Sequence, residues 1–352
     1  MKWQITPIDP RTASDEECRV ENDFSNRIRA ERLPDDPPIP LEEQIQNFRN
    51  IPPFIYVRAW VVSLPKQSEV IAHGIIDFRL TEDNKHVAEV VVEVLPEFRR
   101  QGIAHQLLAL VVDVAQREHR TLLIGNTTER VPAGEAFTNR LGANAGMTAH
   151  TNQLKLSELD RNLIRAWQAQ AVDRASGFEL GLWDGVYPEE DLQGIVELWH
   201  VMNSAPRGSL QIEDFKMTPE IVRAQEKSMV ARGTERWTLY VREKSTGKFA
   251  GYTEVFWNAN RPTILQQAAT AVFPHYRNHG LGRWLKAAML DKVLRDRPQV
   301  EFIRTDNADS NAPMLKINHE LGFKPYMSQT MWQIETAKVL EYLAQHQSAV
   351  PA

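Results

Sequence analysis

The chain has 352 residues, of which 42% are hydrophobic and 25% are charged, and its formal net charge at pH 7 is −5. This composition is typical of globular domains and excludes a collagen-like, disulfide-stapled or intrinsically disordered chain. The acidic balance disfavours binding to nucleic acid or to an anionic membrane surface. The most apolar run, residues 107–112, is far shorter than the roughly 20 residues of a membrane-spanning helix.

The single cysteine, Cys18, cannot form a disulfide within the chain or build a cysteine-type zinc site. The first ten residues lack the apolar core of a signal peptide. Together these features predict a cytoplasmic location. No cluster of His, Asp or Glu has metal-ligand spacing, so we expect no metal site. No feature of the sequence fixes the oligomeric state.

From the amino terminus onward, the sequence predicts two similar sets of helices and strands. The first set is a charged helix over 15–32, strands over 54–62, 70–78 and 87–95, a helix from Ile103, a strand over 121–124 and a helix that ends at Gly142. The second set is helices over 189–202 and 218–232, strands over 237–241, 249–257 and 264–273, a helix from Leu281, a strand over 300–303 and a helix that ends near Gly322.

Two anchors support this internal repeat. The sequence after Pro96 matches the sequence after Pro274, and Gly102 then falls on Gly280. A Leu-Gly pair follows downstream in both halves at nearly the same offset. The repeat length suits one domain each. We therefore expect domains over 1–155 and 177–352, joined by a helical linker over 156–176. Each is expected to be α/β (α+β), with a mixed, mostly antiparallel sheet flanked by helices.

The loop Arg277-Asn-His-Gly-Leu-Gly282 lies between a predicted buried strand and the start of a helix. A helix amino terminus presents unpaired N–H groups and the positive end of the helix dipole, which suit a phosphate. Glycines allow the backbone to approach a ligand closely, and an arginine can add charge-assisted hydrogen bonds. A tight turn without a ligand explains one such loop. Two copies in the same context favour a pyrophosphate site.

The pattern Arg/Gln-x-x-Gly-x-Gly/Ala after a Val-x-Pro strand resembles motif A of the GNAT acyltransferase superfamily, whose loop holds the pyrophosphate of acetyl-CoA. The segment from Asn311 to Phe323 resembles the family's motif B. The resemblance covers both halves and implies two tandem GNAT-like domains, a layout similar to that of mycothiol synthase. In the first half motif B is degenerate, since Val131 falls at the position of Asn311. This implies that the first domain is non-catalytic and the second catalytic.

The resemblance implies backbone hydrogen bonds from the strand before each loop to the pantetheine amides, with a β-bulge that separates this strand from its neighbour. The cofactor-binding residues that it implies, for acetyl-CoA (CoA), are Val272, Arg277, Asn278, His279, Gly280, Leu281, Gly282, Arg283 and Asn311 in the second half, and Val94, Arg99, Arg100, Gln101, Gly102, Ile103 and Ala104 in the first.

Transfer of an acetyl group to an amine needs a general base, and the thiolate leaving group benefits from a donor. Many members of the family use a strand Glu as the base and a motif-B Tyr as the acid. Glu89 has Gln267 as its counterpart in the second half, so Glu254 on the preceding strand is the candidate base there. The motif-B Tyr position holds Asn318 in the second half, and Tyr326 is the nearest tyrosine.

These residues predict an acetyl-CoA-dependent N-acyltransferase that moves an acetyl group to a primary amine of a small molecule by direct attack in a ternary complex. A CoA-binding module without catalysis, used for sensing or assembly, is one alternative. A peptide or protein amino group as the acceptor is another. Within the enzymes, a role like that of mycothiol synthase or an antibiotic-modifying role also stays open.

Overall fold

A computed structural model describes residues 3–65 and 69–346. The chain divides into two compact units, which we describe one at a time. The first unit contains residues 1–148, 208–214 and 329–352, and the second contains 149–207 and 215–328.

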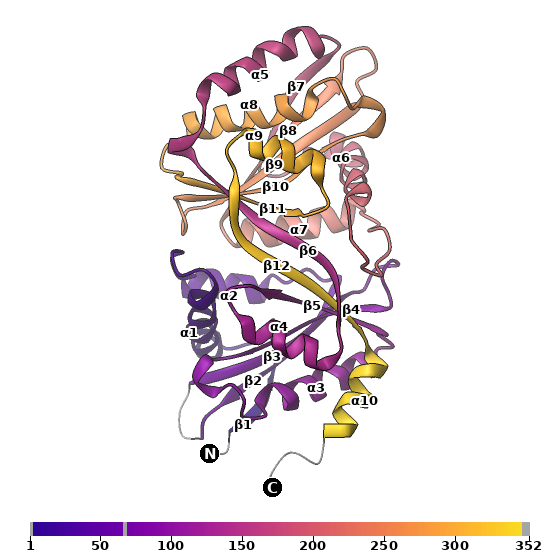
Figure 1. The fold of residues 1–352 in the computed structure, drawn as a ribbon. Helices are drawn as coiled ribbons and strands as arrows, with labels where there is room; N and C mark the ends of the chain where they lie inside the picture. Colours follow the sequence, from indigo (N-terminus) through magenta and orange to yellow (C-terminus); the bar gives the residue numbers. More distant parts are fainter. Residues whose placement is uncertain (1–2, 66–68, 347–352) are drawn as a thin grey trace. The chain divides into compact units, whose positions relative to one another are not determined.

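The first unit follows the predicted order of elements (Figure 1). Its helices and strands are β1 (Gln4–Ile8), α1 (Asp15–Arg32), α2 (Leu41–Arg49), β2 (Ile55–Ser63), β3 (Val70–Arg79), β4 (Val87–Val94), η1 (Pro96–Phe98), α3 (Ile103–Arg117), β5 (Leu122–Thr128), α4 (Pro132–Leu141) and α10 (Thr336–His346), with the beginning of β6 (Asn144–Lys155) and the end of β12 (Lys324–Glu335).

Local sequence explains where several of these elements begin and end. Ser14 and Glu17 form a reciprocal capping box at the start of α1: the Ser14 hydroxyl accepts from the Glu17 N–H, and the Glu17 carboxylate accepts from the Ser14 N–H. At the other end of the unit, α4 ends at Gly142, whose φ of 75° belongs to the left-handed region that favours glycine.

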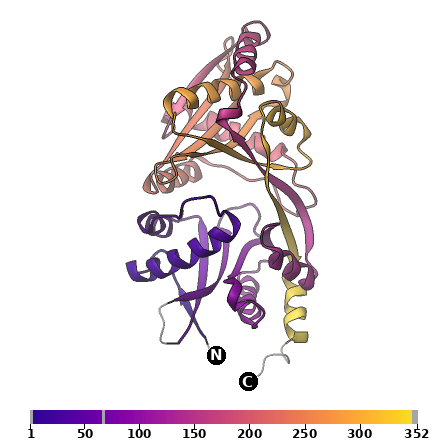
Figure 2. The same cartoon turned by 60° about the vertical axis from the view of Figure 1, so that its left-hand side comes forward.

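The sheet of the first unit has the strand order β1-β2-β3-β4-β5-β12. All neighbouring pairs are antiparallel except β4 and β5, which are parallel. Successive residues of β3 point to opposite faces: His73 contacts Glu21 of α1, and the backbone of Gly74 lies against Leu107 of α3. Helices α1 and α3 therefore cover opposite faces of this sheet (Figure 2).

The second unit repeats the plan. Its elements are the end of β6, η2 (Leu156–Glu158), α5 (Arg161–Arg174), β7 (Phe178–Asp184), η3 (Glu189–Asp191), α6 (Leu192–His200), η4 (Val201–Ser204), α7 (Pro219–Ala231), β8 (Thr234–Glu243), β9 (Phe249–Asn258), β10 (Ile264–Val272), η5 (Pro274–Tyr276), α8 (Leu281–Asp296), β11 (Phe302–Ala308), α9 (Ala312–Glu320) and the beginning of β12.

The sheet of the second unit has the order β6-β11-β10-β9-β8-β7, again with one parallel pair, β10 and β11. Helix α8 packs on one face, over Val255 and Leu265. Helices α6 and α7 cover the other face, where Tyr252 lies among their apolar residues. The predicted fold class, two domains with mixed and mostly antiparallel sheets flanked by helices, is confirmed.

The units differ from the predicted domains 1–155 and 177–352 because the chain passes between them four times, after residues 148, 207, 214 and 328. Residues 149–155 of β6 pair with β11 in the second unit, and residues 329–335 of β12 pair with β5 in the first. Helix α10 then packs on the core of the first unit through Val339 and Leu343. The predicted boundaries missed this exchange because strand partners far apart in sequence leave no local pattern.

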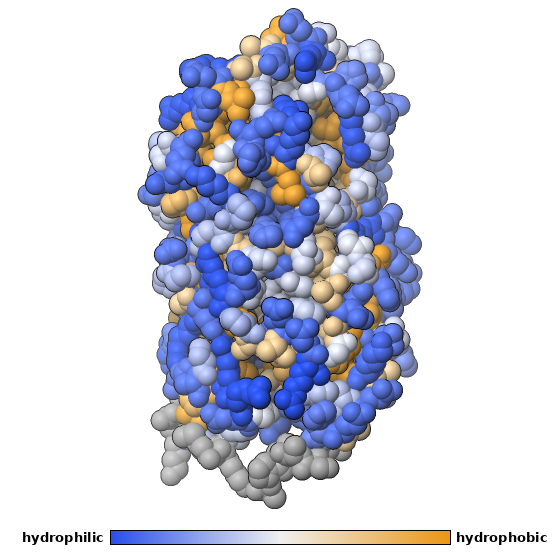
Figure 3. Space-filling model, viewed as in Figure 1, coloured by the Kyte–Doolittle hydropathy of each residue, from blue (hydrophilic) through white to orange (hydrophobic). Residues whose placement is uncertain are grey.

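The segment 156–176 is helical as predicted, but it is not a linker. Helix α5 lies along α8 (Figure 1) and buries Ile164, Trp167 and Ala171 in the core of the second unit. The surface in Figure 3 is mostly hydrophilic over both units, with single apolar residues scattered on it. Among the helices that the structure describes, none is both long enough and apolar enough to cross a membrane.

Candidate functional site

The predicted cofactor loop of the second unit leads from β10 through η5 into α8. Asn278 and Gly280 both have left-handed backbones, with φ of 70° and 77°. Gly280 is the N-cap of α8, and a Cβ placed on it would meet no atom within 4 Å. The N–H groups of Leu281, Gly282 and Arg283 belong to the first turn of the helix and have no acceptor within it. This open cradle fits a pyrophosphate.

The first unit forms the same loop. Arg100 and Gly102 have φ of 64° and 88°, and Gly102 is the N-cap of α3. A Cβ on Gly102 would also meet open space. Ile103 is fully buried at the start of α3, as Leu281 is at the start of α8, so both residues anchor their helix to the core. The sequence repeat therefore corresponds to a repeat of backbone geometry.

Each loop stands at the open end of a pair of diverging parallel strands. In the second unit β10 and β11 pair only from Ile264 to Gln266, although both strands continue. In the first unit β4 and β5 pair only from Val87 to Glu89. Beyond these points the strands separate, so the facing edge of β10 up to Val272, or of β4 up to Val94, offers backbone groups to an extended ligand arm.

The bulge implied for this strand is present in the second unit. The register of β10 against β9 shifts between Gln267 and Thr270, which inserts one extra residue. In the first unit the register of β4 against β3 runs without a shift from Glu89 to Val94. The two clefts therefore differ at the point where the parallel strands begin to diverge.

In each unit an arginine of the loop donates a hydrogen bond to the carbonyl of the last residue of the preceding strand. The two arginines differ in the charged residues beside them. Arg99 Nε donates to the Val94 carbonyl at 3.0 Å, and Arg277 Nε donates to the Val272 carbonyl at 3.2 Å. Arg99 is also paired at both terminal nitrogens with Glu31. Among the described residues, no carboxylate pairs with Arg277. The second loop therefore keeps an uncompensated positive charge.

The remaining predicted loop residues have varied surroundings. Asn278 is exposed, and so is His279, whose ring centroid lies 5.7 Å from that of Phe178. Gln101 donates to the Glu97 carbonyl, and Ala104 is half-buried at the position equivalent to Gly282. Arg283 forms two hydrogen bonds to Glu320, which tie α8 to α9. Arg283 therefore braces α9, in addition to any contact with a ligand.

The motif-B positions are equivalent in structure as well as in sequence. Asn311 is the N-cap of α9 and Val131 is the N-cap of α4, with a proline inside the first turn of both helices. The Asn311 N–H donates a hydrogen bond to the Ala308 carbonyl at 2.9 Å, and the Val131 N–H donates one to the Thr128 carbonyl at 3.1 Å. Only the asparagine adds a polar side chain at this helix start.

Glu254, the predicted base, is buried on the face of the sheet covered by α6 and α7. The Tyr187 hydroxyl donates to its Oε2 at 2.7 Å, and the Thr238 hydroxyl lies at 3.2 Å from the same oxygen. Arg236 Nε is 3.9 Å away. Burial outweighs the opposing effects of Arg236 and the two hydroxyls and raises the pKa of Glu254. Within the described residues, every hydrogen bond and ion pair of Glu254 is made through Oε2, so Oε1 remains available as an acceptor.

The three predicted catalytic residues lie in different surroundings. Asn318 is buried on α9, toward α8, whereas Glu254 faces α6 and α7. Tyr326 is half-buried on β12, and the Arg304 guanidinium lies 4.3 Å from the centre of its ring.

Sequence reasoning missed Lys286, the buried centre of a polar cluster in the second unit. Its Nζ lies 3.1 Å from Gln267 Oε1 and 2.7 Å from Asn318 Oδ1. Burial lowers the pKa of Lys286 to about 7. One signal was present in the sequence, because Lys286 interrupts the apolar stripe of its helix at the position where the first copy has Leu108.

Sequence reasoning also missed an ionic cluster in the first unit. His73 is buried, with Nδ1 2.7 Å from Glu21 and Nε2 2.9 Å from Glu93, and Arg32 pairs with Glu93 at 3.0 Å. Burial alone would lower the pKa of His73, but the two carboxylates overcome it and raise the pKa to about 10. The imidazole is therefore charged at neutral pH, and it joins α1 to β3 and β4.

Glu89, the first-unit counterpart of Gln267, is exposed and lies opposite Asp77 on β3. Burial, followed by the charge of Glu89, raises the pKa of Asp77 to about 7. This carboxylate pair has no equivalent in the second unit, where Val255 lies opposite Gln267.

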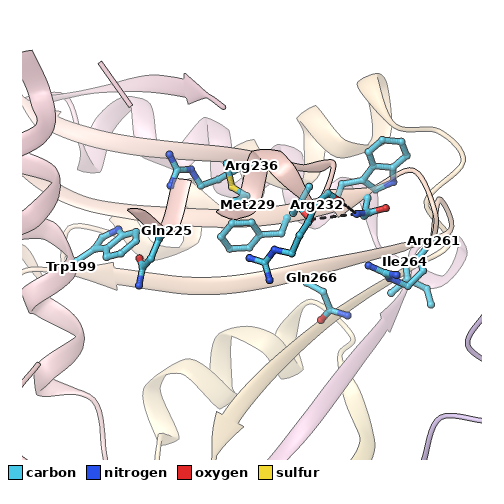
Figure 4. Close-up of a pocket in the computed structure, with 12 residues that line it drawn as sticks. Trp199, Gln225, Met229, Arg232, Arg236, Arg261, Ile264 and Gln266 are labelled. Carbon is cyan, nitrogen blue, oxygen red and sulfur yellow. Dashed lines mark hydrogen bonds between the residues drawn. The ribbon is translucent and has the colours of Figure 1, made fainter. Parts of the chain in front are cut away.

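A cavity of 480 Å³ lies in the second unit, near the start of β8 and β10 and the end of β9 (Figure 4). Trp199 and Gln225 line one end, and Arg261 and Ile264 line the other. Arg236 connects its wall to Glu254. The predicted cofactor residues do not line it. Within the described part of the chain, no group of three or more His, Cys, Asp or Glu residues could hold a metal ion.

Comparison with known proteins agrees with this geometry. Residues 22–142 match the acetyltransferase (GNAT) family model. A tandem GNAT protein from the clavulanic acid biosynthesis pathway, solved without acetyl-CoA, is 24% identical, with 95% of this chain and 99% of that chain covered and a TM-score of 0.74. A GCN5-related N-acetyltransferase from Sphaerobacter thermophilus is 13% identical, with 94% and 96% covered and a TM-score of 0.65.

The glucosamine N-acetyltransferase region of a fungal multi-domain β-N-acetylglucosaminidase is 12% identical, with 95% of this chain and 38% of that chain covered and a TM-score of 0.62. No curated protein matches the chain. The family match lies in the first unit, although the fuller set of motifs lies in the second. Residues 22–142 thus match the acetyltransferase (GNAT) family model, and over nearly its whole length the chain has the fold of tandem GNAT proteins.

Proposed function

We propose that the protein is an acetyl-CoA-dependent N-acetyltransferase that moves an acetyl group to a primary amine of a small molecule, with the chemistry in the second unit. The observation that carries this proposal is the cleft of that unit. An unpaired β10 edge, a β-bulge and a helix amino terminus follow one another along it. Arg277 adds a positive charge that no carboxylate of the described residues neutralises. We infer a cytoplasmic location from the single cysteine, Cys18.

The residues present fit the cofactor. The loop from Arg277 to Arg283 would hold the pyrophosphate through N–H groups and the Arg277 guanidinium. The backbone near Val272 would bind the pantetheine amides, and Asn311 would add one hydrogen bond at the start of α9. Bound acetyl-CoA would supply the acetyl thioester. The first-unit loop offers a second, weaker site, because Glu31 neutralises Arg99 and Val131 replaces the asparagine.

Glu254 is the proposed general base. Its raised pKa makes it a better proton acceptor than an ordinary carboxylate. The Tyr187 and Thr238 hydroxyls orient it through Oε2 and leave Oε1 to take the proton of the attacking amine, directly or through a water. Tyr326 and Asn318 are the proposed hydrogen-bond donors toward the leaving thiolate and the oxyanion.

A CoA-binding module without catalysis is the second candidate. One observation favours it: the positions that hold base and acid in many members of the family are the amides Gln267 and Asn318. Both amides are bonded to Lys286 in the interior. Neither amide can act as a general acid or a general base at neutral pH.

Two variants at one glycine test the cofactor site. Gly280→Asp places a negative charge where the pyrophosphate should lie, and Gly280→Asn is its neutral, isosteric control. Both residues tolerate the left-handed backbone better than other side chains. We expect calorimetry with CoA to show much weaker binding for the Asp variant than for the Asn variant. Equal affinities would exclude this loop as the pyrophosphate site.

Thiol release from acetyl-CoA then separates the two candidate functions. A panel of small-molecule amines and a peptide with a free amino terminus would be supplied as acceptors. Acceptor-dependent release supports the enzyme and identifies the acceptor class. CoA binding without release for any amine supports the non-catalytic module.

A further inference from the structure

The buried amine of Lys286 connects two elements of the second unit that border the proposed cofactor cleft. It lies on α8, the helix that begins at the cofactor loop. Its Nζ donates to Gln267 on β10 at 3.1 Å and to Asn318 on α9 at 2.7 Å. Its side chain is 1% exposed, so the amine has essentially no access to water.

Each of these two amides also forms a hydrogen bond to a residue of another strand. Gln267 Nε2 donates to Thr253 at 2.8 Å and lies 3.3 Å from Thr270, and the hydroxyls of these two threonines are 2.7 Å apart. Gln267 and Thr270 are the two residues between which the register of β10 shifts. The amide of Gln267 therefore spans the bulge.

On the other side, Asn318 Nδ2 donates to Asn307 Oδ1 on β11 at 2.7 Å, and Asn152 of β6 approaches the same oxygen at 3.4 Å. The cluster thus reaches both β10 and β11. These are the strands that stop pairing after Gln266. Polar contacts through α8 and α9 connect the two strands where their own hydrogen bonds are lost.

The two hydrogen bonds that Lys286 Nζ donates are as many as a neutral amine can form. A neutral amine has two N–H donors, and Lys286 has two amide oxygens as acceptors. On another side it faces the Phe323 ring, whose centre is 5.3 Å from Nζ. Burial, the only cause acting on it, lowers its pKa to about 7, so the neutral form is readily available near neutral pH.

The fold does not require this lysine. At the equivalent position of the first unit, α3 carries Leu108, which is buried and apolar. Glu89 and Thr138 stand where the second unit has Gln267 and Asn318. The first unit builds the same layers without the cluster and without a bulge in β4. Because burying an amine is costly, its presence in one copy alone points to a role at the cleft of that copy.

We propose that Lys286 is a positioning residue of the second cofactor cleft: by donating to Gln267 and Asn318 together, it fixes the β10 bulge and the α9 helix at the spacing that admits the pantetheine arm. This inference rests on the proposed function, since it assumes that CoA occupies this cleft. Lys286 acts through its two amide partners and does not itself touch the cofactor.

The test measures the affinity of the full chain for CoA. It concerns the same binding that Gly280→Asp is expected to remove. Lys286→Met keeps the length of the side chain and deletes both donors. We expect it to fold and to bind CoA about tenfold more weakly, because two buried amide oxygens lose their partner and the bulge is released. Lys286→Gln retains a neutral group with two N–H donors, and we expect it to recover most of the affinity.

Leu290→Ala is the matched control, because Leu290 is buried on the same helix and makes none of these hydrogen bonds. We expect it to lower the unfolding midpoint while CoA affinity stays within about twofold of the wild type. Wild-type affinity in Lys286→Met would overturn the inference, and so would equal losses in Lys286→Met and Leu290→Ala. If neither lysine variant folds, Lys286 is a structural residue and the inference is also overturned.

The outcomes also separate this inference from the proposed function. If Gly280→Asp leaves CoA binding unchanged, the second cleft is not the cofactor site and the proposed function fails at its starting point. If Gly280→Asp removes binding while Lys286→Met does not affect it, the cofactor site stands and only the positioning role is lost.

Discussion

Arg99 and Glu31 form a two-point ion pair in the first unit, with guanidinium nitrogens 2.8 and 2.5 Å from the carboxylate oxygens. The equivalent arginine of the second unit, Arg277, instead approaches the Ser204 hydroxyl at 3.5 Å. The two loops have the same backbone, but only one presents a guanidinium whose charge is not already balanced. Charge, rather than shape, therefore distinguishes the two candidate phosphate sites.

This difference predicts unequal effects of two matched substitutions. Arg277→Ala should weaken CoA binding about tenfold or more, because a charge-assisted hydrogen bond to phosphate is lost. Arg99→Ala should change binding much less, since Glu31 already occupies that side chain. Calorimetric titration of the full chain with CoA checks both variants. A larger loss for Arg99→Ala would move the main cofactor site to the first unit.

Sequence patterns predicted the parts of the fold that are local. The apolar run before Pro96 gave β4, and the loop that contains Gly280 was found because its twin stands at Gly102. The exchange of β6 and β12 was missed, since no local pattern records which distant strand completes a sheet. The role of α5 was missed for the same reason: its apolar face was visible, but its partner α8 was not.

The candidate site shows the same limit. Lys286 was overlooked because its partners come from separate elements that only the fold brings together. Glu254 was correctly placed on a central strand, but its neighbours Tyr187 and Thr238 are distant in sequence and could not be inferred. Single residues could be nominated from motifs. The hydrogen bonds that tune them could not.

The assignment of the base predicts a sharp contrast between two glutamates. With a suitable amine acceptor, Glu254→Gln should lower kcat by about 10²–10⁴, because proton removal from the attacking amine is lost. Glu89→Gln, in the first unit, should leave kcat nearly unchanged. Steady-state measurement of thiol release checks both. Loss of turnover in Glu89→Gln alone would place the chemistry in the first unit, where Glu89 faces Asp77.

The ionic cluster around His73 predicts a pH dependence of stability. The pKa of His73 is about 10 in the folded chain, above its ordinary value of 6.5, so the folded state holds this proton more tightly than the unfolded state. The stabilisation is therefore complete below pH 6.5 and is lost as the pH rises through 10. Its size is on the order of a few kcal/mol.

Denaturant unfolding of the wild type and of His73→Gln at pH 6, 8 and 10.5 measures this effect. We expect the difference in unfolding free energy between the two proteins to be largest at pH 6 and smallest at pH 10.5. The signal must report on the first unit, because a chain of two units need not unfold in one step. A difference that grows with pH would contradict a charged imidazole.

The exchanged strand predicts the behaviour of fragments. Residues 1–155 expressed alone should fail to form a cooperative unit, because they lack the β12 strand beside β5 and the helix α10 that buries Val339 and Leu343. Joining residues 208–214 and 329–346 to this fragment through flexible linkers should restore cooperative unfolding, measured by circular dichroism, because these segments complete the first unit. Cooperative unfolding of the bare fragment would mean that β12 is dispensable.

The pairing of β5 with β12 also sets the order in which the chain can mature during synthesis. Strand β5 is made about 200 residues before its partner. At roughly 5–20 residues per second the ribosome needs about 10–40 s to supply it. During that interval the edge of β5 is an open template for the wrong strand. A nascent chain would thus need either a chaperone at this edge or a temporary partner, although the amino-terminal half leaves the ribosome first.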